Sequence, residues 1–417
     1  HRGAGYLSQV STALYEASRQ TIGAFVGARP DDVTVVTRNT TDSLNLLAGC
    51  VPADADGTPG RVLVLDVEHH ANLLPWQRST GGATVLHGAE TVAETLEAIR
   101  AELARAPYAL LALTGASNVT GELLPVADVV AIAHEAGTRV AIDGAQLVPH
   151  RRFSLAETGV DYISYSGHKT YAPFGSGALV GRRDWLDAGT PYLAGGGAVR
   201  QVDLDQVRWT NAPARHEAGS PNVIGAVALA ASCETLASLP AGTLEAHEAY
   251  LRERLVSGLE SIPGVQVVRA WADAPDPVGV VTFSVVGHDP GLVAAYLSAE
   301  HGIGVRDGRF CAHPLLARLG YASGAVRASV GVGTTQEEVD RLITALETYV
   351  TDGPTARYEI VDACWTVADD PRPLPEGSGL SGLIATAAAG FIAGAAGCGP
   401  VPEPQVSAAR AGSLVDA

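Results

Sequence analysis

The sequence SYSGHKTYAPFGSG, residues 164–177, continues an apolar, strand-like run that includes Val160, Tyr162 and Ile163. The segment contains Lys169, the only lysine of the chain; the other 27 of its 28 basic lysine and arginine positions are arginine. A loop rich in glycine and proline follows, where α/β proteins carry their functional groups. Arginine stays protonated, whereas a desolvated lysine amine can lose its proton and attack a carbonyl carbon. We therefore interpret Lys169 as a functional residue rather than a surface lysine.

Apolar runs alternate with helical patterns on the N-terminal side of this segment. Residues 61–67, 108–115 and 138–145 have the pattern of buried strands. Helices are predicted between them, at residues 91–106 with Thr91 and Glu94 in capping-box spacing, and at residues 127–137, ending at Gly137. This alternation predicts an α/β fold with a parallel sheet, right-handed crossovers and a ligand site at the carboxyl ends of the strands.

The pattern changes after about residue 230, where a long helical stretch leads into short strand candidates and further helices. We predict a large domain over residues 1–235, a smaller α+β domain over residues 236–352 and a Pro/Gly/Ala-rich tail over residues 353–417. No charged residue occurs in residues 377–402, which include the GxxxG sequence GFIAG. A membrane helix is one interpretation, but alanine and glycine are weakly apolar, so we expect an Ala/Gly-rich helix or a disordered tail.

Composition restricts the class of protein. The hydrophobic content of 47% allows a large core, and the net charge of −17 without a dense basic stretch argues against nucleic-acid binding. The five cysteines are widely spaced and form no CxxC, which argues against a disulfide framework or a structural zinc site and favours a reducing, cytoplasmic compartment. The chain starts at His1 without methionine or a signal-like segment, and we expect a fragment or an altered sequence.

Polar side chains at the ends of the predicted strands suggest a cofactor site. Asp143 ends one strand, where its carboxylate would lie beneath a cofactor or cap a helix. His69 and His70 follow a second predicted strand. Adjacent side chains on a strand point to opposite faces, so the two histidines would not bind one metal ion together. One of them would instead stack on an aromatic ligand. Thr40 and Thr41 lie where a loop becomes a helix, a position from which they would bind a phosphate or cap the helix.

Together these features indicate pyridoxal phosphate. That cofactor requires a Schiff-base lysine, a carboxylate at its pyridinium nitrogen and a phosphate cradle, and the chain offers Lys169, Asp143 and the threonine-rich helix start. The glycines at residues 195–197 would admit a phosphate closely or form a turn.

Several longer blocks strengthen this interpretation: HRG, VEHHANLLPWQ, SNVTGELLPV, IDGAQLVPH, SGHKTYAPFGSGALVG, HEAGSPN and RFCAHPLL. In their order and content, nearly over residues 1–350, they resemble the class V aminotransferases among the fold-type I pyridoxal-phosphate enzymes, especially the SufS-type cysteine desulfurases. The resemblance implies a large domain with a mostly parallel seven-stranded sheet between helices, a smaller α+β C-terminal domain, and a homodimer with shared active sites.

The resemblance also implies roles for individual residues. Lys169 would form the Schiff base and move protons, Asp143 would pair with the pyridinium nitrogen, Gln146 would bond the ring hydroxyl, and His69 would stack on the ring. The cofactor phosphate would be held by Thr40, Thr41, Ser166 and His168, and across the dimer interface by Gly197 and Ser220. The amino-acid substrate would be bound by His1, Asn118, Arg306 and Arg327.

Cys311 decides which reaction the resemblance implies. In the desulfurases a loop cysteine takes sulfur from L-cysteine as a persulfide, alanine leaves, and the sulfur passes to an acceptor protein. Arg306, Arg309 and His313 near Cys311 would favour its thiolate, whereas a small buried core cysteine is the alternative. We interpret the remaining cysteines as structural: Cys50, Cys233, Cys364 and Cys398.

The chain departs from the family pattern at several positions. Arg309 and Phe310 stand where two histidines commonly precede the cysteine, Ser220 replaces a threonine, and Ala116 replaces a frequent histidine. The leading hypothesis is a cysteine desulfurase. The alternatives are a C–S lyase, an aminotransferase or an epimerase in which Cys311 takes no part, and a non-catalytic scaffold relative.

Overall fold

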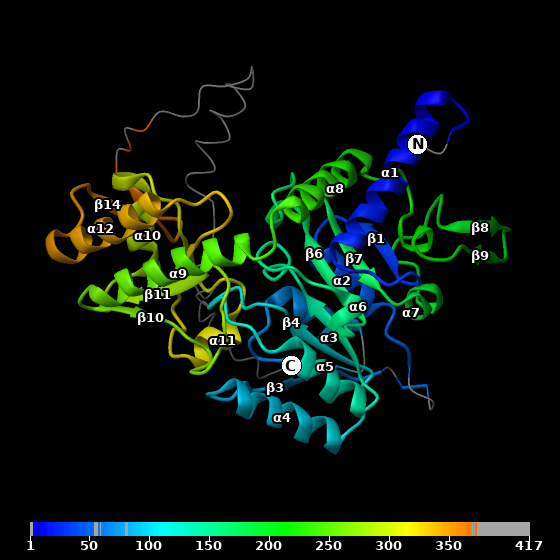
Figure 1. Ribbon diagram of the computed structural model, residues 1–417, viewed down its shortest axis with the longest axis horizontal. Helices are drawn as coiled ribbons and strands as arrows, with labels where there is room; N and C mark the ends of the chain where they lie inside the picture. Colours follow the sequence, from blue (N-terminus) through cyan, green and yellow to red (C-terminus); the bar gives the residue numbers. More distant parts are fainter. Residues whose placement is uncertain are drawn as a thin grey trace, which may run out of the picture.

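The computed structural model describes residues 3–368 apart from residues 54–56, 59, 80 and 81, together with residues 370 and 372. Figure 1 shows a large α/β unit on the right and a smaller unit, built from the later part of the chain, on the left. His1 and residues 373–417, with their GxxxG sequence, lie outside the described residues.

The large unit is built on a seven-stranded sheet in the order β1-β7-β6-β5-β4-β2-β3. Neighbouring strands from β3 to β6 run parallel, whereas β7 is antiparallel to both β6 and β1. The predicted α/β fold with a mostly parallel sheet is therefore confirmed. The strands are β1 (Val33–Thr37), β2 (Val62–Leu65), β3 (Ala83–Leu86), β4 (Leu110–Thr114), β5 (Arg139–Asp143), β6 (Tyr162–Ser166) and β7 (Gly177–Gly181).

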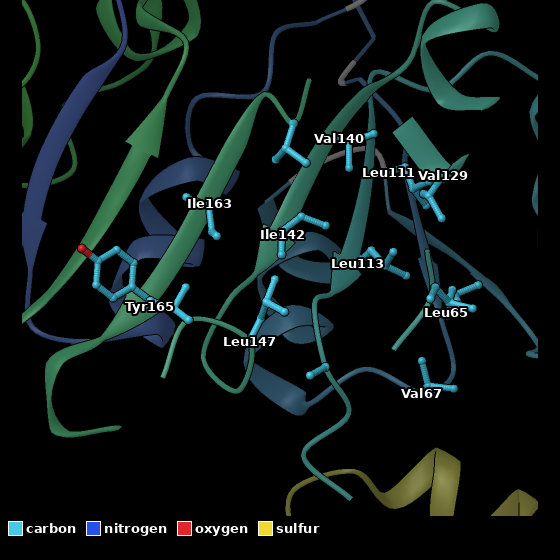
Figure 2. Close-up of a cluster of buried hydrophobic side chains, with 14 of the residues drawn as sticks. Leu65, Val67, Leu111, Leu113, Val129, Val140, Ile142, Leu147, Ile163 and Tyr165 are labelled. Atoms are coloured by element: carbon cyan, nitrogen blue, oxygen red, sulfur yellow. The ribbon is translucent and has the colours of Figure 1, made fainter. Parts of the chain in front are cut away.

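Helices cover both faces of this sheet. In β2, Val62 and Val64 belong to one apolar cluster, with α2 and Trp76. Leu63 and Leu65 belong to a second cluster that contains residues of α1, α4, α5 and α8, part of which Figure 2 shows. Burial on both faces explains why the strands read as continuous apolar runs. The helices are α1 (Tyr6–Phe25), α2 (Thr40–Ala48), α3 (Leu74–Ser79), α4 (Val92–Arg105), α5 (Val126–Glu135), α6 (Leu155–Thr158), α7 (Arg183–Ala188) and α8 (Val223–Ser238).

The predicted helix signals have the expected geometry. Thr91 caps α4, accepting a hydrogen bond from the Glu94 backbone N–H at 3.2 Å. Gly137 follows α5 with φ of +73°, the left-handed conformation that favours glycine. A short hairpin, β8 (Val199–Val202) and β9 (Val207–Trp209), projects from the large unit in Figure 1.

The smaller unit has an antiparallel sheet in the order β10-β11-β13-β12 and its own apolar cluster. Its elements are α9 (Thr243–Ser261), β10 (Val265–Val267), β11 (Val280–Val285), α10 (Pro290–His301), β12 (Arg306–Gly308), α11 (His313–Arg318), β13 (Ala325–Ser329) and α12 (Gln336–Asp352). Helix α11 is an exception in its packing, because Leu315 and Leu316 join the large unit's cluster together with Phe310 and Ala312. The segment around Cys311 is therefore anchored in the core of the large unit.

A second hairpin, β14 (Tyr358–Val361) and β15 (Cys364–Val367), follows α12 within the stretch that the sequence pattern assigned to the tail. Glu300 of α10 accepts hydrogen bonds from the backbone N–H groups of Thr355 and Ala356, both at 3.1 Å, and from the Tyr358 hydroxyl at 2.9 Å. These bonds attach the start of the hairpin to α10. The alternation of Tyr358, Ile360, Trp365 and Val367 was the available signal for it.

Within the part of the chain that the structure describes, no single helix is long and apolar enough to cross a membrane. One bent pair, α8 and α9, meets the length and composition test only when the two helices are combined.

Candidate active site

Lys169 lies directly after β6, in the 3-10 helix η2 (Gly167–Lys169), at the carboxyl edge of the sheet. Its side chain is partly buried. Burial lowers the pKa of the Lys169 amine, and the nearby Asp143 carboxylate acts in the opposite direction. The amine therefore loses its proton more easily than a surface lysine, as a carbonyl-attacking nucleophile requires.

Asp143 ends β5, the strand beside β6, and is 4% exposed. Its Oδ1 accepts a hydrogen bond from the Ala145 N–H at 3.0 Å. Burial raises the pKa of Asp143, opposed by that hydrogen bond and by the charge of Lys169. Gln146 follows in the same turn, partly buried. The two strand ends thus place a carboxyl group and an amine in one electrostatic neighbourhood, as the sequence pattern predicted.

His69 does not lie on a strand, so the prediction that His69 and His70 point to opposite faces of the sheet is wrong. Strand β2 ends at Leu65, and His69 caps the 3-10 helix η1 (His70–Asn72). Its Nδ1 accepts a hydrogen bond from the Ala71 N–H at 3.0 Å, which leaves the proton of the neutral ring on Nε2. Burial, reinforced by the charge of Lys169, lowers the pKa of His69 to about 4, so the ring is neutral at pH 7.

The start of α2 forms a polar cradle with the end of β6. Ser166 Oγ lies 2.8 Å from the Thr40 backbone nitrogen, which donates to it, and 2.7 Å from Thr40 Oγ1. The N-cap of α2 is Asn39 rather than a threonine. A Cβ on Gly177 would lie 2.7 Å from the Asn39 Cα, so only glycine allows the chain to pass this close to the cradle.

The other predicted phosphate residues lie on the surface. Thr41 is exposed on the first turn of α2, and His168 is exposed with its ring stacked on Phe174 at 5.2 Å between centroids. Gly197 and Ser220 lie in two exposed loops, which the Gly219 N–H joins by donating to the Gly196 carbonyl at 2.8 Å.

Arg327 and Asn118 form a bridge between the two units. Arg327 Nη1 donates to the Asn118 carbonyl at 2.7 Å, and Asn118 Nδ2 donates to the Phe310 carbonyl at 2.8 Å. Burial, together with the like charge of Arg306, lowers the pKa of Arg327 to about 10. Its Nε is buried and has no hydrogen-bond partner among the described residues. The edge of the guanidinium that carries Nε therefore remains to bind a carboxylate.

Cys311 lies in a tight turn between β12 and α11. Phe310 and Cys311 have φ of +50° and +54°, in the left-handed region that side chains larger than glycine seldom adopt. The Cys311 carbonyl accepts a hydrogen bond from the His70 N–H at 2.8 Å, and Arg306 Nη2 lies 4.0 Å from Cys311 Sγ. The strained turn is thus held by both units, and it places the thiol beside a cation.

A pocket of about 350 Å³ opens at this turn. Its lining contains Cys311 and His69, and it continues over Leu74 and Pro75 to Thr41, Asn45 and Arg78. His70 also lines it, and its ring packs edge-on against His313 with centroids 4.4 Å apart. The thiol and the His69 ring therefore share one pocket.

Two groups at this site were not singled out from the sequence. Glu68 is buried next to His69 and accepts hydrogen bonds from Thr114 at the end of β4 and from the Asn72 side chain, although its position after a strand resembles that of Asp143. The His70–His313 pair depends on two segments distant in sequence.

The structure does not describe His1, so its role stays a prediction. Within the described residues, no group of three or more histidine, cysteine, aspartate or glutamate side chains is arranged to hold a metal ion.

The donor set fits pyridoxal phosphate: a lysine with a lowered pKa, a buried carboxyl group beside it, a neutral imidazole, and hydroxyl and backbone donors at a helix start. Residues 1–342 match the family model for class-V aminotransferases. The chain belongs to the class-V aminotransferase family. Membership in that family implies the same cofactor.

Members of this family with curated names include close matches in length. The chain is 36% identical to the cysteine desulfurase CsdA of Escherichia coli over 356 residues, 83% of this chain and 86% of the relative. It is 35% identical to a probable cysteine desulfurase of Vibrio cholerae over 350 residues, 83% of this chain and 85% of the relative.

Solved structures of the family have the same fold. An apo cysteine desulfurase from Thermococcus onnurineus aligns with a TM-score of 0.76 at 33% identity, over 84% of this chain and 87% of that one. The crystal structure of E. coli CsdA aligns with a TM-score of 0.74 at 33% identity, with the same coverage. The predicted family and fold are therefore confirmed.

Proposed function

We propose that this class-V enzyme is a cysteine desulfurase that converts L-cysteine to L-alanine and takes the sulfur as a persulfide on Cys311. One observation carries the proposal. The Cys311 thiol lies 4.0 Å from the Arg306 guanidinium, in a turn tied to both units and opening into the pocket that contains His69. A structural core cysteine would need neither the strained turn nor the cation.

The residues of the site suit this chemistry. Pyridoxal phosphate, when bound, supplies the electron sink that stabilises negative charge on substrate carbon. Lys169, with its lowered pKa, would accept a proton from the substrate α-carbon and return protons to carbon. Asp143 would hold the cofactor ring nitrogen, and neutral His69 would lie on the ring face with its proton on Nε2.

Sulfur transfer needs one bond formed and one broken. The Cys311 thiolate forms a bond to the substrate sulfur while the bond from that sulfur to the β-carbon breaks. The electron pair of the broken bond goes to the β-carbon, which takes up a proton to become the methyl group of alanine. Both sulfur atoms of the persulfide are oxidised by one electron each, and the β-carbon is reduced by two.

The substrate carboxylate would bind Arg327 through Nε and Nη2, since Nη1 is already bonded to the Asn118 carbonyl. Asn118 then links substrate binding to the Cys311 turn through its bond to the Phe310 carbonyl. The phosphate would be held by Thr40, Thr41, Ser166 and His168.

The exposed positions of Gly197 and Ser220 support a homodimer in which these residues complete the phosphate site of the second copy. A thiol or a sulfur-acceptor protein would remove the persulfide. The buried thiols of Cys50 and Cys233, which form no disulfide, support a reducing, cytoplasmic setting.

The test is a product assay on purified protein with L-cysteine and a thiol reductant, scoring alanine, pyruvate and sulfide for the wild type, Cys311→Ala and Cys364→Ala. Cys364, a partly exposed thiol on the C-terminal hairpin, is the matched control. We expect alanine and sulfide from the wild type and Cys364→Ala, and neither from Cys311→Ala. Pyruvate formation that survives Cys311→Ala would replace the proposal with a C–S lyase.

A further inference from the structure

We propose that Glu68 is a positioning residue for the cofactor: its two carboxyl oxygens fix the turn that presents His69 to the cofactor ring. The inference rests on the proposed function only in requiring bound pyridoxal phosphate, and it does not depend on which reaction follows.

The hydrogen bonds of Glu68 join three segments of the site. One carboxyl oxygen accepts the Thr114 backbone N–H at 3.0 Å, which connects the ends of β2 and β4. The other accepts Asn72 Nδ2 at 2.6 Å, which closes the five-residue turn around His69. Asn72 in turn accepts the indole N–H of Trp76 through Oδ1 at 3.1 Å.

His69 lies inside this closed turn. Its carbonyl accepts the Asn72 N–H at 2.8 Å, and its Nδ1 accepts the Ala71 N–H at 3.0 Å. The orientation of the imidazole and the position of its proton thus depend on a backbone conformation that the Glu68–Asn72 bond holds. A residue whose only task was to fill space here would be apolar.

Burying the Glu68 carboxyl group reduces the stability of the fold. Glu68 is 1% exposed, and burial raises its pKa well above the usual range, with Asp143 adding to the effect. A buried carboxyl group is retained where its hydrogen bonds have a specific task. The immediate neighbour of Glu68 is the ring-stacking candidate, and Asp143 is the candidate partner of the cofactor nitrogen.

The hydrogen-bond directions predict that the isosteric amide fails. Both Glu68 oxygens accept from N–H donors, so Glu68→Gln must aim its NH₂ group at Thr114 N–H or at Asn72 Nδ2. Rotating the Asn72 amide would relieve that conflict but would turn its NH₂ group toward the indole N–H of Trp76. Glu68→Gln therefore loses at least one buried hydrogen bond in every arrangement.

A compensating pair follows from the same geometry. When Glu68→Gln is combined with Asn72→Asp, the new amide donates to the new carboxylate, which still accepts from Trp76 through its second oxygen. The Thr114 bond is retained. The matched control is Glu122→Gln, because Glu122 is also buried, at 2% exposure, and also accepts backbone N–H groups, from Ala270 and Trp271.

The experiment measures the dissociation constant of pyridoxal 5′-phosphate, its visible absorption maximum in the holoenzyme, and the melting temperature. We expect Glu68→Gln to weaken cofactor binding about tenfold and to shift the absorption maximum, and the Glu68→Gln/Asn72→Asp pair to restore both. Glu122→Gln should leave cofactor binding and absorbance unchanged; both N–H groups donate to one Glu122 oxygen, which the amide oxygen can replace. A Glu68→Gln protein that loses only melting temperature would overturn the inference, as would failure of the pair to restore binding.

A double-mutant cycle tests whether Glu68 acts through His69. In a His69→Ala background, adding Glu68→Gln should change cofactor affinity by less than about twofold, because the ring it positions is absent. A full tenfold effect in that background would refute this role. Wild-type protein that binds no cofactor would overturn the cofactor assignment and this inference together, whereas cofactor binding without alanine formation would overturn only the desulfurase reaction.

Discussion

Arg327→Lys is the change whose effect the structure defines best. Arg327 Nη1 is bonded to the Asn118 carbonyl at 2.7 Å, and Nε is buried without a partner among the described residues. The free edge of the guanidinium can therefore make two parallel hydrogen bonds to the substrate carboxylate. Lysine keeps the positive charge, but its ammonium group cannot hold the Asn118 carbonyl and both carboxylate oxygens with the same planar geometry.

The expected loss can be estimated from one charge-assisted hydrogen bond. Such a bond contributes about 1.5–3 kcal/mol, which corresponds to a decrease of about 10- to 150-fold in kcat/KM. We expect much of the loss in KM, since the carboxylate is bound before and during the reaction. The visible absorbance of the cofactor should be unchanged, because Arg327 is assigned to substrate and not to cofactor.

The assay is steady-state alanine formation over a range of L-cysteine concentrations. The matched control is Arg269→Lys, which alters an exposed arginine paired with Glu260 at 2.8 Å on the surface of the smaller unit. The control should behave as wild type. A kcat/KM for Arg327→Lys within about threefold of wild type would show that no bidentate contact exists at this position, and the carboxylate site would have to be sought elsewhere.

Two further predictions concern Lys169 and His69. Lys169→Ala should abolish the visible absorbance of the cofactor, whereas Arg269→Lys should retain it; absorbance that persists in Lys169→Ala would remove the lysine from its assigned role. Burial lowers the pKa of His69 to about 4, so between about pH 6.5 and pH 4 the unfolded chain binds a proton that the folded chain does not. The contribution of His69 to stability should therefore fall as pH decreases through this window. Urea unfolding midpoints at pH 7.5 and pH 5 should differ less in His69→Asn than in wild type, and an equal difference would contradict the assignment.

Periodicity and strand ends were enough to predict the centre of the candidate site. The apolar runs before Asp143 and Lys169 end where β5 and β6 end, and adjacent parallel strands bring their carboxyl ends together. The polar start of α2 was also predictable, because threonine and asparagine mark the beginning of a helix. These features depend on residues close together in the sequence.

The course of the chain after β2 was less predictable. The apolar run continues to Val67, yet pairing with β4 stops at Val64, and β2 itself ends at Leu65. The side chain of Asp66 instead accepts the Gly88 N–H at 3.0 Å and pairs with Arg318 at 2.8 Å. These contacts come from distant segments, which the local sequence pattern does not reveal. The local pattern therefore predicts His69 on a strand, whereas His69 lies in a turn.

Both the local sequence pattern and contacts between distant segments determine the Cys311 turn. Sequence order assigns it to the smaller domain, but its apolar neighbours Phe310 and Leu315 pack in the core of the large unit, and its carbonyl is bonded to His70 of that unit. The position of the thiol relative to Lys169 is thus set mainly within the core of the large unit. Arg327 stays on the smaller unit's sheet and reaches the same site through Asn118. The nucleophile and the carboxylate-binding arginine, only 16 residues apart in sequence, are therefore held by different cores, and the bonds of Asn118 to both segments keep them in register.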